Sequence, residues 1–332
     1  MPEKLLNGLY RLKIPIPKNP LKFTNVYVLE GNDEWLIIDV GLGGEISKEI
    51  FMKETSELAV NMEKTTFFLT HMHADHCGLI GDVARESSEI LLSKEDLPYI
   101  FPVEDIETFW NREKEFSRIY GFPSSLLDDA VKRHPGYLFP PHKPKGSKIT
   151  YVNDGDVISM CGRELKVIKT PGHTKGHICL YDTNNFILFC GDHVLGNITP
   201  NISSMSTYVN PLFDYLNSLE KVYNLEVKMA FAGHRDPIKD FRGRIDEIKK
   251  HHRLRTMETL DVLKNRKLNA YQIASKMSWD INFPNWDLFP SIQKWFAHLE
   301  TVAHLEELLH RGKVRKEIVE ENDGEVFVYE IA

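Results

Sequence analysis

Residues 70–78 read THMHADHCG and place three histidines and one aspartate within six consecutive positions. The segment follows the apolar run 67–69, a pattern that is typical of a buried strand. In an extended chain, residues two apart project to the same side, so His71 and His73 can approach one ion together. Imidazole is a common ligand of zinc and of other first-row metals. The spacing therefore predicts one half of a metal site.

The rest of this loop offers donors to a second point nearby. Asp75 and His76 follow where the strand has ended and where a helix is expected to begin, near residues 77–79. Further ligands must come from elsewhere, and three residues qualify because each follows an apolar, strand-like run and has a glycine beside it. These candidates are His173 in TPGHTKGH, Asp192 in FILFCGDH and His234 in FAGHRDP.

Imidazole and carboxylate donors together favour zinc or another first-row divalent ion, iron and manganese included, over calcium or magnesium. A single histidine in a loop is usually a polar surface residue, but the joint pattern makes coincidence a poor explanation. His177, four residues after His173, is a weaker candidate and is expected to be structural. Seven other histidines lack such settings and are interpreted as surface, capping or packing residues: His134, His142, His251, His252, His298, His304 and His310.

Several neighbouring residues are candidates for supporting roles. Asp39, after the strand-like WLII, can accept a hydrogen bond from a ligand histidine and fix its tautomer, although a strand-end turn aspartate is an equal alternative. Thr70 and Thr174, next to ligand positions, can serve in the same way. Tyr208 lies beyond Asp192 and is a candidate hydrogen-bond donor to a substrate oxygen, with a packing tyrosine as the alternative. Cys77 is expected to be a buried thiol at a helix start.

Strands alternating with helices predict an α/β core around these loops. Apolar runs with turn signals between them predict strands at 23–31, 34–41, 65–70 and 228–232, and helical patterns lie at 45–60 and 210–223. Between 148 and 170, the turn signals at 153–155 and 161–163 separate short strand-like runs.

Residues 93–142 differ from their surroundings and predict a helical insertion. They are rich in aromatic side chains and end in the proline-rich PPHKPKG. An aromatic segment that follows the first metal loop is a candidate lid over the site, which would favour an apolar acyl group. The alternative is a separate hydrophobic cluster without contact to a ligand.

Residues 241–332 predict a winged-helix-like module, with helices at 242–264, 268–278 and 291–312 and a terminal hairpin that turns at 322–324. This segment has 15 Lys/Arg and 15 Asp/Glu, so its formal net charge is zero. Its candidate recognition helix reads VAHLEELL at 302–309, whereas a DNA-reading helix presents basic and amide side chains. We therefore expect this module to pack beside the cleft or to form a homodimer, and nucleic acid is not an expected partner.

Composition limits the remaining classes. The chain has 332 residues, 42% of them hydrophobic, which is enough for one large domain and a small one. A formal charge of −7 gives no general attraction for phosphate backbones or anionic lipid. The start lacks the apolar core of a signal peptide, no run is long enough to span a membrane, and the four cysteines form no CxxC pair, so a cytoplasmic protein is expected.

On THMHADHCG, TPGHTKGH, CGD and AGH, in that order and after the early strand IIDVG, the sequence resembles the metallo-β-lactamase superfamily over about residues 5–240. The resemblance implies an α/β fold of the four-layer αββα type for residues 1–240, with the helical insertion at 93–142 and the small winged-helix-like domain at 241–332. It also implies that His71, His73 and His173 bind one metal, that Asp75, His76 and His234 bind the other, and that Asp192 bridges them.

Two such ions would activate a water molecule for attack on a carbonyl, and Asp75 could orient it and pass a proton to the leaving group. Asp192 stands where classical β-lactamases with a cysteine ligand have that cysteine, which argues against antibiotic hydrolysis. We expect a dinuclear hydrolase, with zinc as the first choice of metal, that cleaves a small-molecule acyl substrate with a thioester or lactone bond. One alternative is a phosphodiesterase or ribonuclease, and another is a nucleic-acid-binding regulator with a structural or sensory metal centre.

Overall fold

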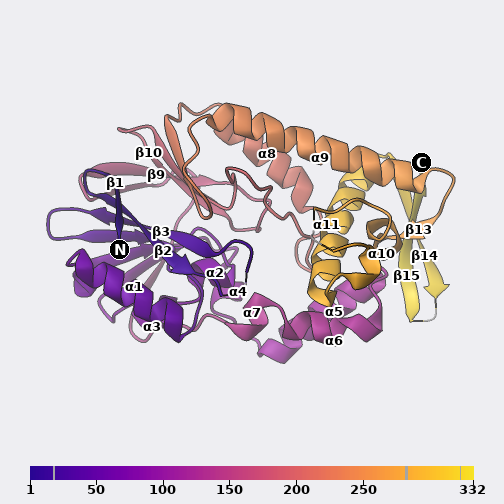
Figure 1. Ribbon diagram of the computed structural model, residues 1–332, viewed down its shortest axis with the longest axis horizontal. Helices are drawn as coiled ribbons and strands as arrows, with labels where there is room; N and C mark the ends of the chain where they lie inside the picture. Colours follow the sequence, from indigo (N-terminus) through magenta and orange to yellow (C-terminus); the bar gives the residue numbers. More distant parts are fainter. Residues whose placement is uncertain (18, 281–282, 322) are drawn as a thin grey trace. The chain divides into compact units, whose positions relative to one another are not determined.

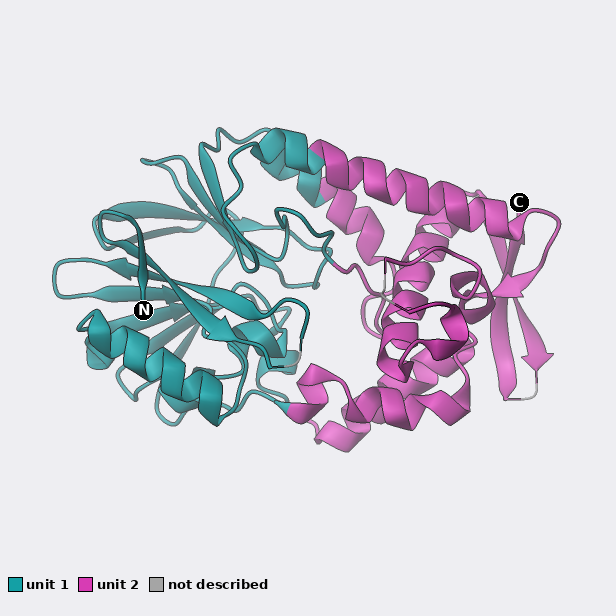
Figure 2. Ribbon diagram, viewed as in Figure 1, with its two compact units in different colours: residues 1–103, 139–200, 218–245 teal, residues 104–138, 201–217, 246–332 magenta. Residues whose placement is uncertain are grey.

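The computed structural model describes residues 1–17, 19–280, 283–321 and 323–332. Figure 2 shows that the chain divides into two compact units, and each is described here by itself. The first unit contains residues 1–103, 139–200 and 218–245, and the second contains residues 104–138, 201–217 and 246–332. Within the described residues, no helix has the length and apolar character needed to cross a membrane.

A seven-stranded sheet forms one half of the first unit (Figure 1). In order across the sheet, its strands are β1 (Glu3–Leu6), β2 (Leu9–Pro15), β3 (Phe23–Glu30), β4 (Trp35–Ile38), β5 (Thr65–Phe68), β6 (Glu89–Leu92) and β7 (Lys148–Tyr151). The strands β1 to β4 pair antiparallel and β4 to β7 pair parallel. Because parallel strands end at the same edge, the loops after β4, β5 and β6 meet there.

A five-stranded sheet forms the other half. Its strands are, in order, β12 (Met229–Ala232), β11 (Ile187–Gly191), β10 (Ile178–Asp182), β9 (Arg163–Lys169) and β8 (Val157–Met160). The pair β11 and β12 is parallel, with Gly191 opposite Ala232, so the residues that follow these two strands leave the sheet side by side. The turn signal at 153–155 marks the place where the chain passes from β7 in one sheet to β8 in the other.

Apolar side chains on both faces of the seven-stranded sheet explain the layering. Leu36 and Phe68 belong to a buried cluster that also contains Phe189 of the second sheet, and this cluster is the core between the sheets. Ile37 and Phe67 alternate with them and pack in a second cluster under the helices of the first half. Those helices are α1 (Glu45–Glu57), η1 (Met62–Lys64), α2 (Ala74–Cys77), α3 (Ile80–Val83) and α4 (Leu97–Ile100).

Two long helices contribute the fourth layer. They are α8 (Pro211–Tyr223) and α9 (Phe241–Leu263), each of which has residues in both units. Within the first unit, Ser218 of α8 donates to the carbonyl of Pro171 at 2.8 Å, and Lys221 pairs with Asp154. These bonds hold α8 beside the five-stranded sheet. The result is the α/β sandwich, in αββα order, that the resemblance implied.

The second unit combines helices with a small sheet of order β13-β15-β14. Its remaining elements are α5 (Ile106–Ile119), α6 (Ser124–Lys132), α7 (Pro135–Leu138), β13 (Leu268–Asn269), α10 (Ala270–Ala274), η2 (Trp286–Leu288), α11 (Ser291–His310), β14 (Val314–Glu321) and β15 (Gly324–Ile331). The aromatic side chains of Trp110, Phe122 and Trp295 belong to one buried cluster that joins α5 and α6 to α11. Buried Glu306 accepts hydrogen bonds from the hydroxyls of Tyr120 and Tyr329 and thereby ties α11 to the end of α5 and to the sheet.

Most predicted elements match within a few residues, and the differences are local. The helix expected near 77–79 begins earlier, at Ala74, with His73 as its extended N-cap residue. The aromatic residues of the insertion fall in both units, because 104–138 group with the C-terminal residues while 93–103 and 139–142 belong to the first unit. The predicted hairpin turn includes Asn322, which lies outside the described residues.

Candidate metal centre

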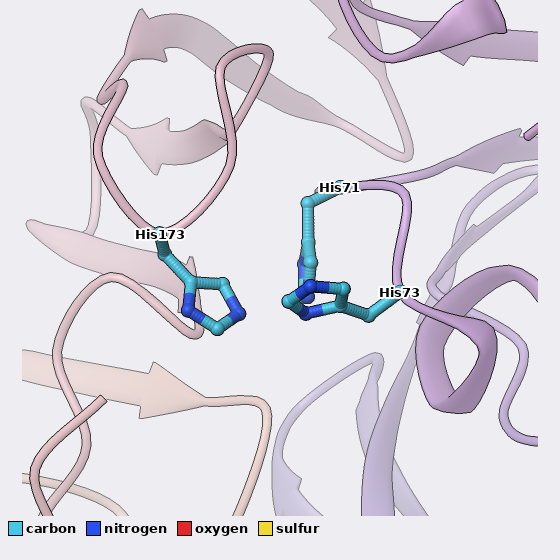
Figure 3. A group of neighbouring side chains, drawn as sticks. All are labelled: His71, His73 and His173. Carbon is cyan, nitrogen blue, oxygen red and sulfur yellow. The ribbon is translucent and has the colours of Figure 1, made fainter. Parts of the chain in front are cut away.

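Three histidines from two loops of the first unit form a compact group. His71 and His73 lie in the loop after β5, and His173 lies in the loop between β9 and β10. Figure 3 shows the three imidazoles pointing toward one another. Their ring centroids lie 4.5–4.8 Å apart, and one nitrogen of each lies within 4.8 Å of the others. We call these residues the three-histidine group.

Asp75, His76 and His234 form a second group with the same compactness. The Nε2 atom of His234 lies 3.3 Å from Oδ2 of Asp75 and 3.3 Å from Nε2 of His76. Asp75 and His76 come from α2, which begins directly after His73. His234 follows β12. We call these residues the Asp75 group.

Asp192 lies between the two groups. Its Oδ2 atom is 3.7 Å from Nε2 of His173 and 3.4 Å from Nε2 of His234, while Oδ1 is 3.5 Å from Nε2 of His76. The structure therefore brings all seven predicted metal ligands together at one edge of the two sheets.

Hydrogen bonds on the far side of the rings fix the histidine tautomers. Nδ1 of His76 lies 2.7 Å from Oδ2 of Asp39, and Nδ1 of His71 lies 2.9 Å from the hydroxyl of Thr70. That hydroxyl and the amide of Thr70 in turn donate to the Asp39 carboxylate at 2.8–3.0 Å. The Asp39 carboxylate only accepts, so it accepts a hydrogen bond from Nδ1 of His76, and the Thr70 hydroxyl, whose own proton goes to Asp39, accepts from Nδ1 of His71. In the neutral form of either ring the Nε2 lone pair then faces the centre. The supporting roles expected for Asp39 and Thr70 are therefore present in the geometry.

Hydrogen bonds to strand β3 position the side chain of His234 and the end of β12 before it. Nδ1 of His234 lies 3.0 Å from the carbonyl of Phe23, which leaves its Nε2 toward the centre. Asn25 and Tyr27 donate from their side chains to the carbonyl of Ala232 at 2.9 and 2.6 Å. These bonds were not predicted, although Asn25 is a polar residue within a largely apolar strand, and that was the available signal.

The glycines beside the ligands have a steric reason. A Cβ atom on Gly233 would lie 2.4 Å from Oδ1 of Asp192 and 2.5 Å from Cε1 of His76. A Cβ atom on Gly191 would lie 2.8 Å from the hydroxyl of Thr70, at a backbone φ of +47°. Both positions thus require glycine for the ligands to come so close.

Asp96 is a buried residue of the site that the sequence patterns did not predict. Its carboxylate accepts hydrogen bonds from the amides of Met72 and Gly176 at 3.0 and 2.7 Å and from the hydroxyl of Thr174 at 2.6 Å. Burial raises the pKa of Asp96 to about 6 even though these bonds favour the anion. Nothing in the local sequence SKEDLP distinguishes this aspartate from a turn residue.

Other candidates near the loops have structural contacts. His177 is fully buried, with Nδ1 at 2.8 Å from the hydroxyl of Thr170, and its Nε2 accepts from the amide of Asp192 at 3.2 Å, so it supports a ligand as expected.

Burial raises the pKa of the Cys77 thiol, which points at the carbonyls of Met72 and His73. Tyr208 lies in the second unit, where its hydroxyl donates to Asp214 at 2.7 Å. A role for Tyr208 toward substrate stays a prediction.

Electrostatics differ between the two groups. Burial, together with the neighbouring imidazole of His173, lowers the pKa of His73 to about 3, so this ring is a neutral donor at pH 7. Burial would also lower the pKa of His234, but Asp192 and Asp75 overcome it and raise the pKa to about 10. The carboxylates around His76 raise its pKa in the same way. The Asp75 group therefore stabilises positive charge at the point where its nitrogen atoms converge.

The donor set fits divalent cations. Nε2 of His71 is buried and has no hydrogen-bond partner among the residues that the structure describes, which is costly unless the atom has another partner. Neutral imidazoles and carboxylates at this spacing are ligands of zinc and related first-row ions. A buried lone pair that no protein group satisfies, within a ring of further donors, is the arrangement expected of a metal ligand.

The fold and the donor groups thus define an αββα protein with a metal-binding edge. A sequence model of the metallo-beta-lactamase superfamily matches residues 19–234, and the chain belongs to this superfamily. Among solved structures, a metallo-beta-lactamase family protein of Thermus thermophilus has a TM-score of 0.78 and 30% sequence identity, covering 99% of this chain and 100% of that chain.

Two relatives extend the comparison. A Caenorhabditis elegans protein described as a beta-lactamase-like protein 2 homolog is 27% identical over 269 residues, which cover 80% of this chain and 74% of that protein. An atrochrysone carboxyl ACP thioesterase of Aspergillus fumigatus is 26% identical over 246 residues, which cover 74% of this chain and 61% of the thioesterase. The chain therefore spans less than two thirds of that thioesterase.

Proposed function

We propose that this metallo-beta-lactamase-fold hydrolase binds two divalent cations, with Zn²⁺ as the first choice and iron or manganese as alternatives, and cleaves a carboxylic ester-type bond. A thioester is the first candidate and a lactone the second. The three-histidine group holds one cation, the Asp75 group holds the other, and Asp192 contacts both. The observation that carries this proposal is the position of Asp192, whose two oxygens lie 3.4–3.7 Å from ligand nitrogens of both groups.

When bound, two such ions make water acidic enough to ionise near neutral pH and polarise a substrate carbonyl. The chain's own residues then orient the reactants. Asp75 has 19% of its side chain exposed, against 10% for Asp192, so its carboxylate is the more accessible of the two to substrate. The nearby imidazoles hold its pKa below the ordinary value although burial opposes this, so Asp75 is an anion. Because Oδ2 faces the nitrogen of His234, Oδ1 is the oxygen that would take up a proton and pass it to the leaving group.

Two observations support an acyl substrate. Ala74, directly after His73, belongs to a buried apolar cluster with Ile16 and Leu42, and the side chain of Phe139 packs against this cluster while remaining partly exposed. An apolar wall beside a metal loop suits an acyl chain better than a phosphodiester. The likeness to an ACP thioesterase points in the same direction.

The test is hydrolysis by purified protein reconstituted with Zn²⁺, Fe²⁺ or Mn²⁺. The panel contains acyl thioesters of increasing chain length, lactones, simple esters and a generic phosphodiester. Thioester or lactone cleavage that disappears in Asp192→Ala would support the proposal. Preferential cleavage of the phosphodiester would favour the nuclease alternative, and nucleic-acid binding without hydrolysis of any ester would favour the regulator.

Two variants refine the substrate assignment. Phe139→Ala should lower kcat/KM more for long acyl chains than for acetyl thioesters, since Phe139 offers apolar surface. Tyr208→Phe should raise KM if its hydroxyl donates to substrate, and should leave KM unchanged if Tyr208 only bonds Asp214.

The assignment of 1–240 as the catalytic domain and of 241–332 as a winged-helix-like module is part of this proposal. The cytoplasmic location and the homodimer stay predictions from the sequence.

A further inference from the structure

Asp96 connects the two loops that carry the three-histidine group. It lies after β6, at the edge where β5 also ends, and only 1% of its surface is exposed. One carboxylate oxygen accepts from the amide of Met72, the residue between His71 and His73. The carboxylate also accepts from the hydroxyl of Thr174 and the amide of Gly176. These two residues lie in the loop that carries His173, so one side chain holds together loops that follow strands of different sheets.

The connection requires a carboxylate. Two of its three partners are backbone amides, which can only donate, and Asp96 accepts from the Thr174 hydroxyl as well. An asparagine amide would turn an NH₂ group toward at least one of these donors, because only one of its two terminal atoms accepts. A buried donor facing a donor costs the desolvation of both groups. Asparagine is therefore close in size but cannot make all three bonds.

The fit around this carboxylate is tight. A Cβ atom on Gly176 would lie 2.1 Å from the hydroxyl of Ser93 and 2.6 Å from both the amide nitrogen and Oδ1 of Asp96. The backbone carbonyl of Asp96 accepts from the amides of Tyr99 and Ile100, so α4 anchors the residue from behind. The loop that carries His173 thus lies as close to Asp96 as a residue without a Cβ atom allows.

We propose that Asp96 is a positioning residue that sets the placement of His173 relative to His71 and His73 and thereby determines the affinity of the three-histidine group for its cation. This inference rests on the proposed function, which requires that group to bind a cation. Two of the three ligands share one loop, whereas His173 comes from the other. Loss of the Asp96 contacts therefore loosens His173 relative to His71 and His73, which remain joined in one loop. The Asp75 group draws its histidines from α2 and from the residues after β12, whereas these three hydrogen bonds of the Asp96 carboxylate go to the two loops of the three-histidine group.

The test measures cation binding without reference to turnover. The full-length protein is stripped with a chelator and titrated with Zn²⁺ against a chromophoric competitor, which gives two dissociation constants and the stoichiometry. For Asp96→Asn we expect one site to weaken by about 10- to 100-fold, the range for loss of a supporting contact behind a metal ligand, with the other site within about twofold. The absorption spectrum of Co²⁺ bound at the weakened site should also change. Thr174→Val, which removes one of the three bonds, should give a smaller weakening of the same site.

The matched control is Glu95→Gln. Glu95 is the neighbouring acid in the same turn, but its carboxylate pairs with Lys169 at 2.8 Å. This variant should retain both affinities. Wild-type affinity at both sites in Asp96→Asn, or a lower melting temperature of its metal-free form with unchanged affinities, would overturn the inference and leave Asp96 with a purely structural role. If the wild-type protein itself binds no divalent cation, the proposed function fails first, so the two failures are distinguishable.

Discussion

The strongest test of the tautomer network is Asp39→Asn. In the native chain, the Asp39 carboxylate lies 2.7 Å from Nδ1 of His76 and accepts from the hydroxyl and the amide of Thr70. The asparagine oxygen can keep the bond to the Thr70 amide. Its NH₂ group then faces Nδ1–H of His76, and two donors meet. His76 relieves this conflict by moving its proton to Nε2, the atom that points at Asp192 and His234.

The expected magnitude follows from this shift. A protonated Nε2 cannot ligate a cation, so binding at the Asp75 group must include the cost of returning the proton to Nδ1 against an unfavourable partner. Replacing such supporting groups typically costs 10- to 100-fold in metal affinity, which is about 1.4–2.7 kcal/mol at about 1.4 kcal/mol per factor of ten. The loss extends to the three-histidine group in weaker form, because Asp39 reaches His71 only through the hydroxyl of Thr70.

The assay is competitive Zn²⁺ titration of chelator-stripped protein, with circular dichroism to confirm the fold. Asp182→Asn is the matched control, because Asp182 is also a buried aspartate at the end of a strand, but it pairs with Arg163 and with the turn at 184–185. This control should lower the stability and leave the metal affinity unchanged. If Asp39→Asn binds both ions as tightly as the native chain, the tautomer argument is wrong and Asp39 is only a strand-end turn residue.

Three further predictions follow from the same geometry. Asp192→Ala should lose most of the bound metal, measured by elemental analysis, together with turnover; retained activity would contradict a shared ligand. Gly233→Ala should weaken metal binding and destabilise the fold by about 1–3 kcal/mol, as overpacking does, since its Cβ would lie 2.5 Å from His76; an unchanged affinity would mean that the backbone yields. Burial lowers the pKa of His252 and His298 in the second unit to about 3. The unfolded chain, with ordinary values near 6.5, therefore binds more protons between pH 3 and 6.5, and stability falls as the pH drops through that range, by about 2 kcal/mol per histidine at pH 5. Denaturant unfolding at pH 7.5 and 5 should show this loss, and His298→Gln should show less of it.

Local sequence patterns predicted the strands and the residues that the structure brings together at the candidate site, and they did so for a physical reason. A buried strand is recognisable from a short apolar run, and the residue after it must lie at a sheet edge, which is why Asp192 and His234 were found from their settings alone. The HxH spacing of His71 and His73 is likewise a local property of extended chain. These signals do not depend on knowing which strands are neighbours.

Contacts between distant segments could not be predicted. Asp96 binds residues 24 and 78–80 positions away, and Asn25 bonds a carbonyl 207 positions away. Neither residue has a distinctive neighbour in the sequence, so its role depends on the order of strands in the two sheets. The start of α2 was misplaced for a smaller reason: Ala74 follows a ligand residue directly, and no polar cap side chain marks the boundary.

The aromatic insertion shows why composition does not determine a role. Trp110 and Phe122 of the insertion are buried with Trp295 in one cluster. Packing alone therefore explains part of the insertion's aromatic content, which is what the alternative to a lid predicted. Phe139, from the same predicted insertion, instead packs against the apolar residues next to His73. The sequence alone could not show which rings pack in the cluster with Trp295 and which pack near His73, because both sets of rings occur in similar helical stretches.

Charge balance connects the site to the proposed chemistry. Asp39, Asp75 and Asp192 place three negative charges within or directly behind the ligand set. If the two divalent cations of the proposed function bind, they would bring four positive charges against these three, before the charge of a bound hydroxide is counted. Cations at this place would stabilise negative charge that grows on a substrate oxygen, as it does when a carbonyl becomes tetrahedral. A further nearby carboxylate, Asp96, is turned toward backbone amides and a hydroxyl and is therefore not part of the donor set.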